Sequence, residues 1–154
     1  MNIRKATIKD INRLIELRLD YLRTDHGELS DEQEQIIRTQ LQPYFEKHIP
    51  MGDFLAIFAE TDDAVVSVAF LVISERPANL SFITGITGTV LNVLTYPAYR
   101  RKGIASQVIS ALIEEAKSLG VSTIHLSATD DGKPMYEKLG FMLPAHTEML
   151  LKLV

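Results

Sequence analysis

The chain has 154 residues, a usual size for one domain, and a formal net charge of −4. It contains no cysteine, which excludes disulfides, cysteine nucleophiles and cysteine-ligated zinc. Its four histidines form no H-E-x-x-H motif, so we expect no metal site. The acidic balance disfavours nucleic acid, and no apolar run approaches the roughly 20 residues of a membrane span. Without a signal-peptide pattern at the N-terminus, we expect a cytoplasmic protein.

The first element is predicted to be a short strand over residues 3–7. The pattern Thr7-x-x-Asp10 then has the form of a capping box and predicts a helix. Apolar residues at helical spacing continue to Leu22 and support that prediction.

A second helix is predicted to begin after Ser30, because Ser30-x-x-Gln33 repeats the capping pattern. Pro43 lies within this helix and cannot donate a backbone hydrogen bond. We therefore expect a kink or a new turn near Gln42.

An antiparallel hairpin is predicted next, from Phe54 to Glu60 and from Ala64 to Ser74, with Thr61-Asp62-Asp63 as its turn. The segment Glu75–Gly88 carries proline, asparagine and glycine and is predicted to be a loop. Its length is typical of a functional loop.

The centre of the chain has a strand–helix–strand pattern. Thr89–Thr95 is β-branched and apolar, a helix with one apolar face follows from Gly103 to Gly120, and Thr123–Ser127 is a further strand. Such a unit normally makes its two strands parallel.

The last elements are predicted to be a short helix and a strand region. Pro134 suits the first turn of a helix that continues over Met135–Leu139. Phe141–Leu143 and Glu148–Leu153 are predicted strands. Four strands before and two after the central helix predict a mixed α/β domain.

The segment between Pro97 and Ala105 has the features of a phosphate site. It joins a strand to a helix N-terminus, where free backbone N–H groups and a partial positive charge attract anions. Gly103 allows close approach to the backbone, and three basic residues precede it. The plainer interpretation is a strand–helix junction with incidental basic residues. Neither G-x-G-x-x-G nor the P-loop pattern is present.

These residues carry a family resemblance. Arg100, Gly103 and Ala105 occupy the marked places of R/Q-x-x-G-x-G/A, the signature of the GNAT superfamily of acetyl-CoA-dependent N-acetyltransferases. Met135–Phe141 resembles the LYEKLGF segment that follows downstream in many members, and Leu91–Thr95 resembles the strand before the signature.

The resemblance implies a fold and a reaction. The fold is a mixed sheet of six or seven strands flanked by helices, with a splayed V between the two parallel central strands, within one domain over residues 1–154. The reaction is direct transfer of an acetyl group from acetyl-CoA to a primary amine, with a small molecule as the expected acceptor. Direct transfer needs no covalent enzyme intermediate.

The resemblance also implies site residues. Backbone groups of Val93, Leu94 and Thr95 would pair with the pantetheine arm, and Leu94 or Thr95 would hold the developing oxyanion. The pyrophosphate would lie over Arg100, Arg101, Lys102, Gly103, Ile104 and Ala105. Thr129 stands near the place of an asparagine common in the family.

Tyr136 matches the tyrosine proposed to protonate the departing CoA thiolate, although a tyrosine packed in the core is its plainer interpretation. No base is assigned, because the strand over Thr89–Thr95 contains no acid. The remaining acids and histidines considered are more typical of solvated groups: Asp25, His26, Glu28, Glu75 and His125. His125 could equally be a histidine packed in the core.

Acceptor recognition is expected from the first two helices and the Glu75–Gly88 loop, with five residues as candidates: Tyr21, Asp25, Tyr44, Phe82 and Tyr99. Two other functions stay open, namely acetylation of a protein N-terminus or lysine, and acyl-CoA sensing without turnover. A homodimer is a weaker expectation.

Overall fold

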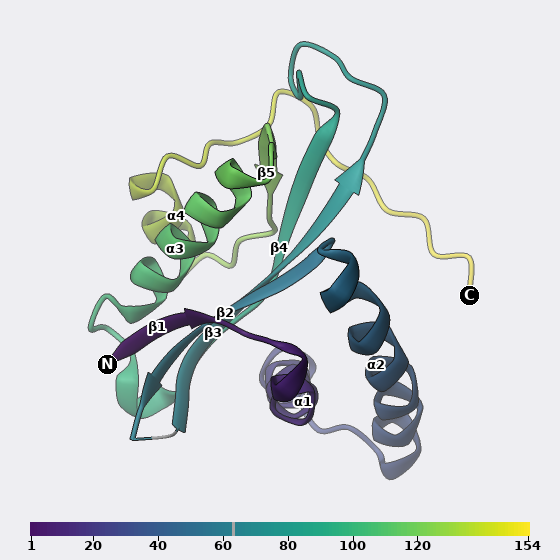
Figure 1. The fold of residues 1–154 in the computed structure, drawn as a ribbon, viewed down its shortest axis with the longest axis vertical. Coiled ribbons are helices and arrows are strands. Elements are labelled where there is room, and N and C mark those ends of the chain that lie inside the picture. The colour runs from purple at the N-terminus through teal and green to yellow at the C-terminus, as the bar shows by residue number, and fades with distance from the viewer. Residues whose placement is uncertain (63) are drawn as a thin grey trace.

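The computed structural model describes residues 1–62 and 64–154 (Figure 1). Its described strands form one five-stranded sheet in the order β1-β2-β3-β4-β5, antiparallel except for the parallel pair β4–β5. The strands are β1 (Asn2–Lys5), β2 (Phe54–Thr61), β3 (Ala64–Glu75), β4 (Ile86–Thr95) and β5 (Thr123–His125). The predicted hairpin and the parallel unit are confirmed; Asp63, in the predicted hairpin turn, lies outside the described residues.

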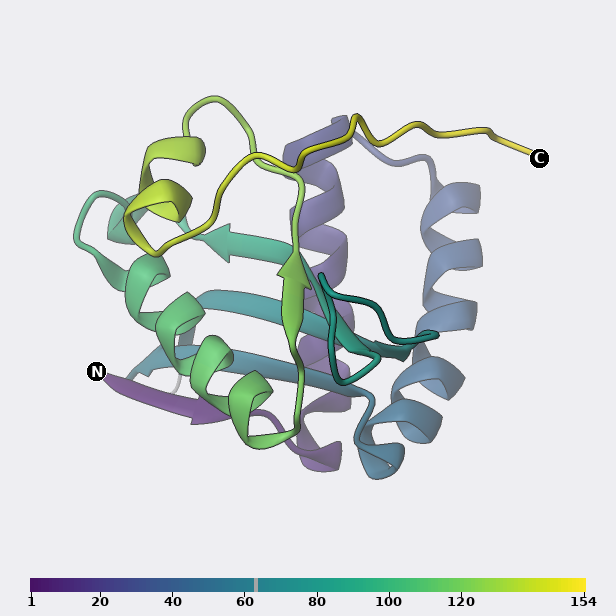
Figure 2. The same cartoon turned by 90° about the horizontal axis from the view of Figure 1, so that it is seen from above.

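Helices cover both faces of the sheet (Figures 1 and 2). The short η1 (Ile8–Asp10) leads into α1 (Ile11–His26), which packs with α2 (Asp31–Met51) on one face. On the other face lie α3 (Ile104–Ser118), preceded by η2 (Pro97–Tyr99), and the short α4 (Lys133–Lys138). Each face has its own apolar core, so the predicted α/β fold with a mixed, helix-flanked sheet is confirmed.

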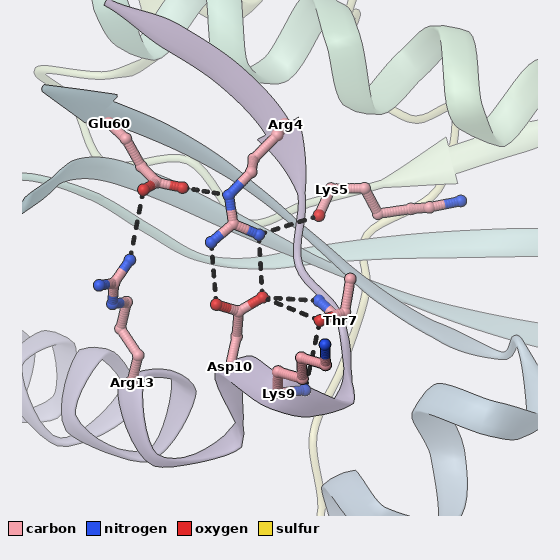
Figure 3. Close-up of polar contacts among 7 residues, drawn as sticks. All are labelled: Arg4, Lys5, Thr7, Lys9, Asp10, Arg13 and Glu60. Carbon is pink, nitrogen blue, oxygen red and sulfur yellow. Dashed lines mark hydrogen bonds and ion pairs between the residues drawn. The ribbon is translucent and has the colours of Figure 1, made fainter. Parts of the chain in front are cut away.

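The start of α1 is tied to the sheet by an ion-pair network (Figure 3). Two nitrogens of Arg4 on β1 donate to the two oxygens of Asp10, each at 2.9 Å. Arg4 also binds Glu60 of β2, and Arg13 of α1 reaches the same carboxylate at 3.4 Å. The Thr7 amide donates to Asp10 at 2.7 Å, which completes the predicted capping box. Arg4, followed by the Thr7 amide, lowers the pKa of Asp10 to about 2 against the opposing effect of burial.

The second helix is longer and more regular than predicted. No turn interrupts it near Gln42, and it contains both Pro43 and Pro50. Both prolines are exposed, so water can satisfy the carbonyl groups that each proline leaves without an amide partner. The capping box from Ser30 to Gln33 is confirmed.

Four strand predictions are corrected. β4 begins at Ile86 rather than Thr89, so the preceding loop ends earlier, and β5 ends at His125 rather than Ser127. Phe141–Leu143 and Glu148–Leu153 are not strands, and the described sheet therefore has five strands instead of six or seven. The physical reason is that neither segment meets a strand edge with which its backbone pairs within the described residues.

Candidate active site

The two parallel strands separate soon after they meet. Their pairing runs from Thr87 with Thr123 only to Thr89 with His125, and Figure 2 shows β5 turned steeply away from the direction of β4. In β4 a bulge follows, because one residue more lies on β4 than on β3 between Leu91 and Leu94. The splayed V predicted between the parallel strands is therefore present.

Asn92 forms the bulge. Its φ of +58° lies in the left-handed region, which asparagine adopts more readily than β-branched or bulky residues. Its buried amide is fixed on both sides: the nitrogen donates to the Leu17 carbonyl at 3.4 Å, and the oxygen accepts from Arg18 at 3.3 Å. The bend in β4 is thus held by α1.

A cleft of about 1540 Å³ occupies the V. It exceeds the roughly 300–1,000 Å³ of an ordinary small-molecule pocket, so it suits a long ligand. Its walls are the part of β4 beyond the pairing, the continuation of β5, the first turn of α3, and α4. Nine of the ten sequence-predicted cofactor residues line it together: Val93, Leu94, Thr95, Arg100, Arg101, Gly103, Ile104, Ala105 and Thr129.

One end of the cleft has free backbone donors. Gly103, with φ of +75°, is the N-cap of α3. The first amide of this helix with an acceptor is that of Gln107, which donates to the Gly103 carbonyl at 3.2 Å. Within the described residues, the amides from Gly103 to Ser106 therefore have no acceptor. Such an end binds phosphate through its amides and its partial positive charge.

The basic residues before this helix have different positions. Arg100 donates through Nε to the Thr95 carbonyl at 2.8 Å, which holds the loop against the end of β4. Arg101 lines the cleft in a left-handed conformation, with φ of +60°. Lys102 does not line the cleft; its ammonium lies 5.8 Å from the ring centre of Tyr99. Its predicted contact with the pyrophosphate therefore finds no support in this geometry.

Tyr136 of α4 lies in the same cleft and is 8% exposed. Its ring packs edge-on against Phe141, with centroids 5.7 Å apart. Burial raises the pKa of Tyr136, with a smaller contribution from Tyr21. None of the residues described forms a hydrogen bond with its hydroxyl. The phenol is thus protonated at neutral pH and free to donate a proton within the cleft.

Thr129 caps the entry to α4. Its hydroxyl accepts from the Gly132 amide at 3.1 Å, and its carbonyl accepts from Lys133 at 2.9 Å. A hydroxyl that accepts one bond still has its proton to donate. Thr129 can therefore shape α4 and also contact a ligand in the cleft.

Four of the five candidate acceptor residues line one of two cavities. Tyr21, Asp25 and Tyr99 line the cleft, whereas Tyr44 lines a smaller cavity beside it. Phe82 lines neither and stacks with Arg76.

Among the candidate bases, Asp25 and His125 line the cleft; Glu28, Glu75 and His26 do not. The Asp25 carboxylate lies 3.1 Å from the ring of His26. Of these five candidates, Asp25 and His125 are therefore the two that border the cleft.

Three residues were not identified from the sequence. The sequence pattern presents Asn92 only as part of an apolar strand, and its tolerance of a positive φ is the one local sign of a bulge. Arg18 lies within the helical stripe of the first predicted helix, which gives it no distinguishing signal. Arg76, in the loop after β3, adds a cation to the cleft and has no local sequence signal.

Two negative findings apply to residues 1–62 and 64–154. No group of three or more histidines and acids is arranged to hold a metal ion. None of the helices combines the length and apolar content that a bilayer crossing demands.

Comparison with solved structures supports the fold across almost the whole chain. A predicted acetyltransferase of Clostridium acetobutylicum, crystallised with acetyl-CoA, is 29% identical, with a TM-score of 0.85 over 97% of this chain and 95% of that one. A GCN5-related N-acetyltransferase of Ralstonia eutropha is 18% identical, with a TM-score of 0.81 over 97% of both chains.

Sequence comparison agrees. The uncharacterized N-acetyltransferase ycf52 of Pyropia yezoensis is 29% identical over 84 residues, which span 49% of this chain and only 48% of that relative. The model of the Acetyltransferase (GNAT) family matches residues 12–141. Since this match covers most of the chain, including β2 to β5 and Tyr136, the chain belongs to the Acetyltransferase (GNAT) family.

Proposed function

We propose that this protein transfers an acetyl group directly from acetyl-CoA to the primary amine of a small molecule. One observation carries the proposal: the protonated Tyr136 phenol and the free amides of Gly103–Ser106 lie at different places in one long cleft. The amides suit a pyrophosphate, and the phenol suits a leaving thiolate. A pyrophosphate joined to a thioester by a long arm is the chemistry of an acyl-CoA.

The residues present fit such a donor. The helix end and Arg101 would hold the pyrophosphate, and Gly103 leaves room for close approach. The unpaired side of β4 beyond Thr89 would accept an extended arm as an added strand. The Clostridium acetobutylicum relative was solved with acetyl-CoA, which supports the same donor here.

The strand register favours one residue as oxyanion donor. The Tyr96 amide donates to Val66 of β3 at 3.0 Å. Backbone groups alternate along a strand, so the Leu94 amide faces β3 as well, and the Thr95 amide faces the cleft. Thr95 rather than Leu94 would therefore stabilise negative charge on the reacting carbonyl oxygen.

The attacking amine must lose its proton. An alkylamine with a pKa near 10.4 is about 1 part in 2,500 neutral at pH 7, a handicap of roughly 4.6 kcal/mol. Transfer from water into the cleft lowers that pKa, and Asp25 or His125 can take up the proton through water. Tyr136 then supplies a proton to the thiolate as the carbon–sulfur bond breaks.

The test has two steps. Calorimetry with CoA first measures whether the donor binds, and a thiol-release assay with acetyl-CoA then compares polyamines, amino acids, aminoglycosides and peptides. Turnover with a small amine supports the proposal. Turnover with peptides alone would make the protein a peptide or protein acetyltransferase, whereas binding without any turnover would indicate a sensor. No CoA binding at low salt would refute the site itself.

A further inference from the structure

A second cavity lies beside the bulge of β4, on the face of the sheet covered by α1 and α2. It has a volume of about 190 Å³. Eight residues line it: Arg18, Gln40, Leu41, Tyr44, Phe45, Phe54, Phe70 and Leu91. Leu91 also lines the large cleft, so the two spaces adjoin at β4.

Arg18 is the one charged residue of this cavity, and it is half-buried. Its guanidinium donates to Asn92 at 3.3 Å and lies 5.9 Å from the ring centre of Tyr21. Among the described residues, no carboxylate lies within ion-pair distance of it. A guanidinium has five N–H donors in a rigid fork, so most of its donors are available to a ligand.

The acids nearest to Arg18 along α1 have other partners. Asp20 accepts from the Tyr96 hydroxyl at 2.5 Å and from Arg23 at 3.0 Å. Glu16 accepts from Arg38 at 2.7 Å. Both of these carboxylates are thus engaged, while the half-buried cation of Arg18 lines an aromatic cavity. Burial lowers the pKa of Arg18, and smaller opposing contributions from Tyr21, Tyr44 and Asp25 offset only part of that effect.

We propose that Arg18 binds an anionic group of the acceptor, so that the acceptor is a small amine that also carries a carboxylate. This inference rests on the proposed acetyltransferase function. A carboxylate matches the fork of a guanidinium bidentately. The walls of Phe45, Phe54 and Phe70 would then hold an apolar side chain.

The distance along β4 agrees with a compact acceptor. Arg18 bonds to Asn92, and Asn92 lies two residues before Leu94, a spacing of at most about 7 Å along a strand. An anion at Arg18 would therefore place an amine a few bonds away beside Leu94 and Thr95. An amino acid with an apolar side chain fits these limits of charge, size and reach.

Matched pairs of amines test this inference. The thiol-release assay compares leucine with 3-methylbutylamine, and phenylalanine with phenethylamine, which differ only in the carboxylate. Aminoethyl phosphate and ethanolamine form a third pair and show whether a phosphate is preferred instead. We expect kcat/KM at least tenfold higher for the carboxylate-bearing member of at least one pair.

Arg18→Gln should reduce that preference at least tenfold, mainly through KM, and Arg18→Lys should restore part of it. Arg38→Gln, which removes an arginine paired with Glu16 on the surface, is the matched control and should keep the preference. Circular dichroism checks that each variant folds. Equal rates for both members of every pair would refute the inference and leave the acetyltransferase proposal intact. The comparison of amine pairs with the wild type gives this answer even when a variant fails to fold. No turnover with any amine would refute both.

Discussion

Asp10→Asn tests the network that fixes α1 to the sheet. The substitution removes the charge that Arg4 neutralises but keeps an oxygen that can accept from the Thr7 amide. The side chain of Asp10 is only 12% exposed, so its interaction with Arg4 is partly shielded from solvent. Loss of the charge should therefore reduce the free energy of unfolding.

The magnitude follows from the pKa of Asp10. It falls from 3.8 to about 2 on folding, a difference of about 1.8 pH units. At about 1.4 kcal/mol per unit, this corresponds to about 2 kcal/mol at neutral pH. For a domain of this size, about 2 kcal/mol lowers Tm by roughly 4–8 °C.

The pH dependence gives the decisive result. Because the folded pKa is depressed, the stabilisation is fully present above pH 3.8 and is lost as the pH falls through about 2. Urea unfolding followed by circular dichroism should therefore show a difference of about 2 kcal/mol between wild type and Asp10→Asn at pH 7, shrinking toward pH 2. Asp31→Asn, at the exposed first turn of α2, is the control and should change stability by less than about 0.5 kcal/mol. A difference that stays constant from pH 7 to pH 2 would contradict the ionic origin of the effect.

Three further predictions concern the cleft. Tyr136→Phe should lower kcat by about 10²-fold or more with little change in CoA affinity, since only a proton donor is lost; an unchanged kcat in the thiol-release assay would remove Tyr136 from the reaction. Because burial raises the pKa of Tyr136, kcat/KM should rise about tenfold per pH unit from pH 7 to 9 as the amine loses its proton, and a decline beginning below pH 9 would argue against this phenol as the acid. Gly103→Val should weaken CoA binding at least tenfold by calorimetry, because valine rarely adopts φ of +75° and would distort the helix end. Gly52→Val imposes the same strain at φ of +78° at a residue that does not line the cleft, and equal CoA affinities in the two variants would contradict the role of Gly103.

Much of the fold follows from local signals in the sequence. The capping boxes at Thr7 and Ser30, and the strand–helix–strand pattern around α3, are decided by residues close together in the chain. The prediction of C-terminal strands was wrong because strand pairing depends on residues that are distant in the chain. A strand forms only when another edge accepts its hydrogen bonds, and residues 148–154 meet none within the described chain.

The candidate site was predictable where it depends on one contiguous segment. Residues 100–105 surround the first turn of α3, so the motif alone places its backbone donors. The motif does not predict the position of the Lys102 side chain, which lies over the ring of Tyr99. Arg18 and Asn92 are 74 positions apart, so a contact between them is decided by tertiary packing and not by local pattern.

The opening between β4 and β5 links the stability of the fold to the binding of a ligand. Past Thr89 and His125, the inner side of β4 lacks the neighbour that a continuous sheet would give it. An extended ligand that forms hydrogen bonds with those backbone groups takes the place of a neighbouring strand. The thermal stability of the protein should therefore increase in proportion to the logarithm of the ligand concentration. The difference between the melting temperatures with and without the thioester would thus report how much the bound ligand stabilises the fold.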